Sequence, residues 1–141
     1  MSRNNRKWRI RVVNAPAIPQ NRTGFMIPES ISKFPDNSKF LVYDSGMNDP
    51  DRILIFSSNY ALKALASTPH IATDGTFKLC PSLWTQMITV HGLYPGCGSI
   101  PYVFGLLPNK SQETYVKFFT ALKNCETNLS PTNCLSDFEL D

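Results

Sequence analysis

The sequence predicts an α/β fold with a mixed sheet, in which three antiparallel strands are followed by a helix and a fourth strand. Three apolar runs, at 70–79, 86–94 and 100–107, are separated only by short connecting segments, as in an antiparallel meander. The segment at 111–123 has the periodicity of a helix, and a short strand-like run follows it at 134–136. Because a crossover that contains a helix joins parallel strands, the third and fourth strands are expected to be parallel.

A hairpin and a short helix are expected ahead of this sheet. Residues 40–43 and 53–56 are apolar and β-prone, and the segment between them is dense in turn-forming residues. Ser57 or Ser58 is then expected to cap a short helix, and Pro69 prevents that helix from continuing. We interpret this stretch as a lead-in to the main sheet.

Strand periodicity assigns the side chains of the strand at 70–79 to two faces. Phe77 belongs to the apolar face, whereas Asp74 and Lys78 belong to the opposite face. Gly75 is expected to kink or bulge the strand beside Asp74, since glycine weakens the interior of a strand. The periodicity therefore places a carboxylate and a lysine on one face.

The later core elements are predicted from their apolar patterning. The strand at 100–107 is almost wholly apolar, which predicts burial on both faces near the centre of the sheet. Ser111 is suited to cap the helix that follows, and Glu113 suits its first turn. The packing stripe of this helix consists of Tyr115, Phe118, Phe119 and Leu122.

Basic residues are concentrated at the N-terminus of the chain. Six of the 14 lysines and arginines precede Glu29, the first acidic residue, although the net charge of the whole chain is only +3. A basic arm of this kind suits contact with the phosphates of DNA or nuclear import, and the alternative is a solvated terminus without a partner. The residues expected to contact nucleic acid are Arg3, Arg6, Lys7, Arg9 and Arg11.

The chain is expected to form one domain, or most of one, in three consecutive parts. Hydrophobic residues make up 42% of the sequence, which is enough for an apolar core. The predicted parts are a basic irregular arm at 1–38, the hairpin and helix lead-in at 39–67, and the main sheet with its helix at 68–141.

Composition also disfavours several classes of protein. No apolar run approaches the roughly 18 residues that a membrane span requires. Charge at the N-terminus is not followed by an apolar segment, so we expect no secretory signal and an intracellular, nuclear location. The four cysteines and two histidines lack the spacing of a zinc site, and we expect reduced thiols and no small-molecule cofactor.

Two short acidic motifs carry most of the functional information. One is Asp74-Gly-Thr-Phe-Lys78, and the other is Asp137-Phe-Glu139. Adjacent strands lie about 4.8 Å apart, so carboxylates on neighbouring strands suit a pair of Mg²⁺ ions roughly 3.5–4 Å apart, as used to cleave and join phosphodiesters. The simpler alternatives are a turn residue before glycine for Asp74 and a helix cap for Asp137.

The stretch from about Phe40 to Asp141 resembles the transposases of Mutator-like elements. The resemblance covers most of the chain and depends on the order and spacing of several motifs, each of which is weak alone. These motifs are Asp74-Gly-Thr-Phe-Lys78, Pro81 followed by Gln86, Val90-His91-Gly92, Val103 to Pro108 followed by Lys110, Tyr115, and Asp137-Phe-Glu139. The resemblance implies a ribonuclease H-like fold, truncated here, in which the fourth strand, at 134–136, lies beside the first, at 70–79.

The resemblance also implies a site of the DDE type. Asp74 matches the first aspartate of that site and Asp137 the second, and both would be catalytic ligands of Mg²⁺ or Mn²⁺. Three residues are possible auxiliaries, and each has a simpler interpretation: Lys78 as a solvated lysine, His91 as a hydrogen-bonded strand histidine, and Glu139 as a surface residue. The family's third acid lies beyond residue 141, so we expect metal binding to be weak or absent and this chain to be inactive alone.

Two functions remain open from the sequence. The first is a partial transposase domain whose parent cleaves DNA and transfers its strands in a metal-dependent reaction. The alternative is a non-enzymatic, domesticated or decayed remnant that binds DNA or protein. A complete nuclease that uses Glu139 as its third acid is disfavoured, because two ligands from one short strand crowd one side of the metal pair.

Overall fold

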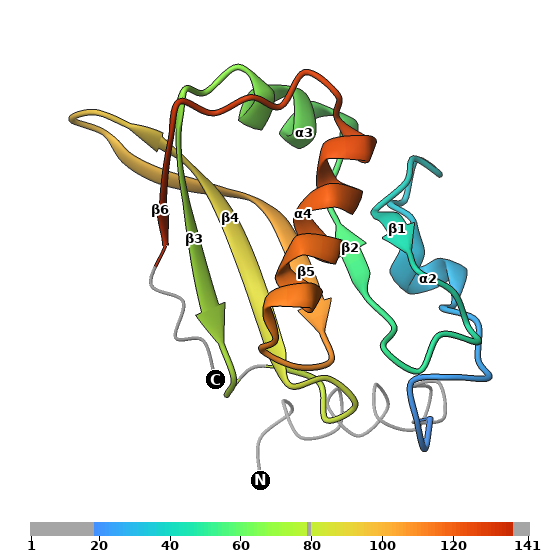
Figure 1. Cartoon of the computed structure of the whole chain (residues 1–141). Helices are drawn as coiled ribbons and strands as arrows, with labels where there is room; N and C mark the ends of the chain where they lie inside the picture. Colours follow the sequence, from blue (N-terminus) through green and yellow to red (C-terminus); the bar gives the residue numbers. More distant parts are fainter. Residues whose placement is uncertain (1–18, 79, 137–141) are drawn as a thin grey trace, which may run out of the picture.

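A computed structural model describes residues 19–78 and 80–136 of the chain. Within these residues the strands form one six-stranded mixed sheet in the order β1-β2-β5-β4-β3-β6 (Figure 1). The α/β class predicted from the sequence is confirmed. The elements are β1 (Leu41–Asp44), β2 (Leu54–Phe56), β3 (His70–Thr76), β4 (Gln86–Tyr94), β5 (Gly98–Leu107), β6 (Asn133–Ser136), α2 (Glu29–Ser32), α3 (Asn59–Ala66) and α4 (Gln112–Cys125).

The centre of the sheet is an antiparallel meander of β3, β4 and β5. After β5 the chain crosses through α4 and returns as β6, which pairs in parallel with β3. The described pairing of these two strands runs from His70 opposite Asn133 to Thr73 opposite Ser136. β5 and β6 are therefore parallel, as expected for a connection that contains a helix.

The N-terminal hairpin belongs to the same sheet. β1 pairs with β2, and β2 pairs in antiparallel fashion with β5, where Leu54 lies opposite Leu106 and Phe56 opposite Phe104. The sequence predicted the hairpin but did not identify its partner, because strand periodicity carries no information about which distant strand lies alongside.

One face of the sheet packs against α3 and α4 (Figure 1). Both helices begin as predicted: the Ser58 side chain accepts a hydrogen bond from the Ala61 N–H, and the Ser111 side chain accepts one from the Thr114 N–H. The apolar stripe of α4 enters the core, with Phe118 fully buried. The described strand and helix residues at the centre of this core include Ile55, Leu65, Ile88, Val90, Val103, Leu107, Phe118 and Leu122.

The other face carries a second, smaller cluster over β2 and β5. Leu54, Trp84 and Leu106 form it, and the segment that contains Phe25 packs against them. Arg52 is 1% exposed and holds this segment in place. Its guanidinium donates hydrogen bonds of 2.9 Å to the carbonyl oxygens of residues 22 and 25, and its Nη2 lies 2.6 Å from Oδ2 of Asp44.

Three predictions about β3 are wrong. The strand ends at Thr76 instead of continuing to 79, so Lys78 lies in a turn beyond it and does not share a strand face with Asp74. Phe77 is 48% exposed instead of belonging to the apolar face. The described β3–β4 pairing runs through Gly75 without a register shift, so the glycine does not form a bulge there.

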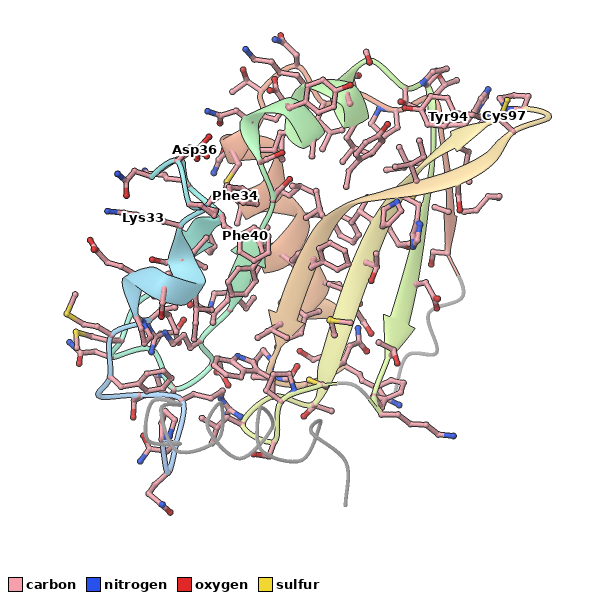
Figure 2. All side chains as sticks on the ribbon, turned by 180° about the vertical axis from the view of Figure 1, so that it is seen from behind. Lys33, Phe34, Asp36, Phe40, Tyr94 and Cys97 are labelled. Atoms are coloured by element: carbon pink, nitrogen blue, oxygen red, sulfur yellow. The ribbon has the colours of Figure 1, made fainter. Side chains whose placement is uncertain are left out.

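The predicted burial of the third core strand on both faces is confirmed for its second half, where Val103 and Leu107 belong to one cluster and Leu106 to the other, but is wrong for its first residues. β5 is exposed from Gly98 to Pro101, and Ile100 is 48% exposed. This half belongs to the hairpin with β4, which extends away from the helices and carries Tyr94 and Cys97 near its tip (Figure 2). Irregular structure was predicted for residues 1–38, but the four residues of α2 form a single helical turn there. Residues 1–18 lie outside the described part of the chain.

Candidate functional site

The carboxyl ends of three parallel strands meet at one edge of the sheet. β3, β5 and β6 all point the same way, and α4 begins at this same edge, at the lower side of Figure 1. We call it the carboxyl edge and define it by residues 74–78, 107–111 and 136. Open α/β sheets bind ligands at the carboxyl ends of their strands, so this edge is the first place to look for a site.

Asp74 lies near the end of β3 and is exposed. Its neighbours Ile71 and Thr73 are each 4% exposed and point into the core, so strand alternation directs the Asp74 side chain to the face opposite α4. On β4 it lies across from Thr89. An exposed carboxylate at this position is accessible to a metal ion or a polynucleotide.

The other two acids of the predicted site, Asp137 and Glu139, lie outside the described residues. The described β3–β6 pairing ends with Thr73 opposite Ser136. The residue that follows each of them in the sequence is an aspartate, Asp74 or Asp137. The described residues therefore include Asp74 and end one position before Asp137.

A buried polar pair supports the strand directly behind Asp74. Gln86 is 1% exposed, and the Tyr115 hydroxyl lies 3.1 Å from both Nε2 and Oε1 of its carboxamide. A Cβ atom added at Gly75 would lie 3.3 Å from Cδ of Gln86. A side chain at position 75 would therefore press against the Gln86 carboxamide.

His91 lies on β4 opposite Ala72. By strand alternation it shares a face with Asp74, and it is two residues along β4 from Thr89. Its Nδ1 atom is buried and has no hydrogen-bond partner within the described part of the chain. The choice between an auxiliary role for His91 and a hydrogen-bonded strand histidine stays a prediction.

A lysine and an aromatic ring meet at the carboxyl edge. Lys110, between β5 and α4, places its Nζ atom 4.5 Å from the centroid of the Phe77 ring. Sequence patterning missed this contact because it assigned Phe77 to the core face of a longer strand. The parallel orientation of β3 and β5 is the signal that would have found it, since both residues follow the ends of those strands. Lys78 is exposed in the adjacent turn.

The five basic residues predicted to contact nucleic acid, Arg3, Arg6, Lys7, Arg9 and Arg11, lie outside the described residues. The next arginine in the sequence, Arg22, is described and is held by the domain. Its guanidinium donates hydrogen bonds of 3.0 and 3.1 Å to the Pro50 carbonyl and one of 2.8 Å to the Leu83 carbonyl. Arg22 thus joins two loops of the domain.

Residues 19–78 and 80–136 contain no group of three or more histidines, cysteines or acidic residues placed to hold a metal ion. Among the same residues, no helix combines the length and apolar character needed to cross a bilayer.

Comparisons with models of known protein families, with curated proteins and with solved structures found no match to this chain. Function is accordingly inferred from the residues of the carboxyl edge and from their geometry.

Proposed function

We propose that this chain supplies two carboxylates, Asp74 and Asp137, to a metal-dependent site that cleaves and joins DNA, as in the transposases of Mutator-like elements. The sheet would then be of the ribonuclease H-like type. The order β5-β4-β3-β6 supports this assignment, because an antiparallel meander is followed by a helix and a strand parallel to the first.

The observation that carries the proposal is the register of β3 and β6. Thr73 lies opposite Ser136 in a parallel pair. One further step in the same register would pair Asp74 with Asp137, on strands about 4.8 Å apart. Side chains opposite each other in a parallel pair project to the same face, which suits two carboxylates that share metal ions.

The donor set fits Mg²⁺ or Mn²⁺. Carboxylate oxygen is the ligand that these hard cations prefer, and Mg²⁺ is commonly held by only one or two protein carboxylates together with water. Bound metal would activate the attacking oxygen and stabilise the leaving oxygen of a phosphodiester. Asp74 and Asp137 would hold and orient the metal, while the Gln86–Tyr115 pair keeps the end of β3 in position.

Binding of Mn²⁺, measured by electron paramagnetic resonance, tests this function. The chain is expected to bind Mn²⁺ weakly, and Asp74→Asn and Asp137→Asn should each reduce that binding. Glu29→Gln is the matched control, since Glu29 is an exposed acid on α2, on the far side of the sheet from β3 (Figure 1). Unchanged Mn²⁺ binding in Asp74→Asn would contradict the proposal.

The same variants distinguish the metal-dependent enzyme from the second candidate function, a non-enzymatic remnant that binds DNA or protein. In that case Asp74→Asn combined with Asp137→Asn retains or improves metal-free DNA binding, because removing two negative charges reduces repulsion of phosphate. That result, together with no Mn²⁺ binding by the unmodified chain, would favour the remnant over the metal-dependent enzyme.

A further inference from the structure

We propose that Phe77 and Lys110 form a contact for unpaired DNA at the carboxyl edge, next to Asp74. This inference rests on the proposed function and extends it, because it assigns residues that hold the polynucleotide beside the predicted metal ligands. The partner is an unpaired stretch of DNA, with a base on the Phe77 ring and a phosphate at the Lys110 ammonium.

The placement of the two residues is the first argument. Phe77 directly follows β3, and its separation from Asp74 is three residues, which limits the distance between their Cα atoms to about 10 Å. Lys110 comes from the other side of the sheet centre, between the end of β5 and the start of α4. A strand of DNA that reaches Asp74 along the carboxyl edge would therefore pass close to both residues.

The state of the Phe77 side chain is the second argument. Phe77 remains 48% exposed although Nζ of Lys110 lies 4.5 Å from the centroid of its ring. A cation over one part of an aromatic ring positions both groups. Because about half of the residue is exposed, a base can approach the ring, and stacking on it requires a base that is not paired in a duplex.

The chemistry of the pair also predicts which features of DNA it recognises. A phenyl ring has no hydrogen-bond donor or acceptor, so it does not read the edges of bases. A lysine ammonium contacts phosphate as a point charge. Binding through this pair is therefore sensitive to salt and to strandedness, and indifferent to sequence.

The chain contains a matched pair of residues for comparison. Tyr60 is 82% exposed on α3, and Lys63 follows it on the same helix. α3 precedes β3 and lies at the opposite end of the sheet from the carboxyl edge (Figure 1). Variants of Tyr60 and Lys63 thus remove an exposed aromatic ring and a lysine without altering the proposed contact.

Fluorescence anisotropy of labelled oligonucleotides, with the full chain and a metal chelator present, tests the inference. Phe77→Ala and Phe77→Leu should weaken binding of a single-stranded oligonucleotide at least about fivefold and leave duplex binding unchanged. Lys110→Gln should weaken binding and reduce the slope of log K against log salt by about one. Tyr60→Ala and Lys63→Gln should have neither effect.

Phe77→Leu keeps an apolar side chain, so it distinguishes loss of the ring from loss of the fold, which circular dichroism monitors for every variant. No binding of single strands by the unmodified chain, unchanged binding in Phe77→Leu, or equal losses for duplex would overturn the inference. Measurements of Mn²⁺ binding distinguish failure of this inference from failure of the proposed function. Phe77→Leu should bind Mn²⁺ as the unmodified chain does, whereas Asp74→Asn should bind it more weakly.

Discussion

The Tyr115 hydroxyl on α4 lies 3.1 Å from both polar atoms of the Gln86 carboxamide at the start of β4. Both residues are buried, and the carboxamide lies against Gly75, the residue after Asp74. This contact joins the helix, the central strand and the end of β3. It therefore links the stability of the core to the geometry of the carboxyl edge.

Removal of the Tyr115 hydroxyl should destabilise the protein. Tyr115→Phe leaves the buried Gln86 carboxamide without this partner, and an unsatisfied buried polar group costs about 1–3 kcal/mol. Urea denaturation followed by circular dichroism measures the change in the free energy of unfolding. Tyr60→Phe, which removes an exposed hydroxyl, should have no effect. Equal stability of the two variants would show that the Gln86–Tyr115 contact does not support the fold.

Replacement of Gly75 by alanine should destabilise the protein, because the added methyl group presses against the Gln86 side chain. The added Cβ lies 3.3 Å from Cδ of Gln86, which is fully enclosed and held by Tyr115, so Gly75→Ala should cost about 1 kcal/mol or more. In a Gln86→Ala background the obstructing atoms are absent, and the same substitution should cost much less. A double-mutant cycle of unfolding free energies measures this coupling. Additive effects of the two substitutions would exclude the proposed contact as the cause.

The Asp44–Arg52 pair should make stability depend on acid pH. Burial raises the pKa of Asp44, whereas hydrogen bonds from Arg52 and from the Gly46 N–H lower it. The lowering effects together are larger, so the pKa of Asp44 lies below its ordinary value of 3.8. Because the folded-state pKa is depressed, this stabilisation is complete above the unfolded-state pKa. It is lost as the pH falls through the folded-state pKa.

Unfolding free energies between pH 6 and pH 2 test this relationship. Asp44→Asn should reduce stability at pH 6 by roughly 2–3 kcal/mol, since it leaves the buried Arg52 charge without its carboxylate. It should also flatten the loss of stability below about pH 4. Glu29→Gln is the control, because the Glu29 carboxylate pairs with Lys33 at an exposed position, and its effect should be small. An acid profile of Asp44→Asn parallel to that of the unmodified chain would be incompatible with this account.

Local patterns in the sequence predicted the elements whose determinants are local. The α4 helix has its cap at Ser111 and its packing stripe at regular spacing, and the bounds of β4 agree with the apolar alternation. The parallel orientation of the fourth strand followed from the helix in the crossover. These features depend on residues that are neighbours in the sequence or on general rules of chain connection.

Features that depend on distant contacts were missed. Nothing near Arg52 indicates burial, since its partners at residues 22, 25 and 44 are brought to it only by the folded sheet. The sequence likewise did not indicate that β3 ends early or that Phe77 meets Lys110 across the carboxyl edge. At the candidate site, the accessible position of Asp74 agrees with the sequence, whereas its approach to Asp137 stays a prediction.

Cleavage of the backbone by bound iron tests the convergence of Asp74 and Asp137 most directly. Fe²⁺ binds oxygen ligands in place of Mg²⁺, and with ascorbate and peroxide it produces radicals that cut the chain beside the ion. We predict two cuts in the full chain, one near residue 74 and one near residue 137, both lost in Asp74→Asn and both retained in Glu29→Gln. Cuts near only one of these residues, or cuts that persist in Asp74→Asn, would contradict a shared metal site.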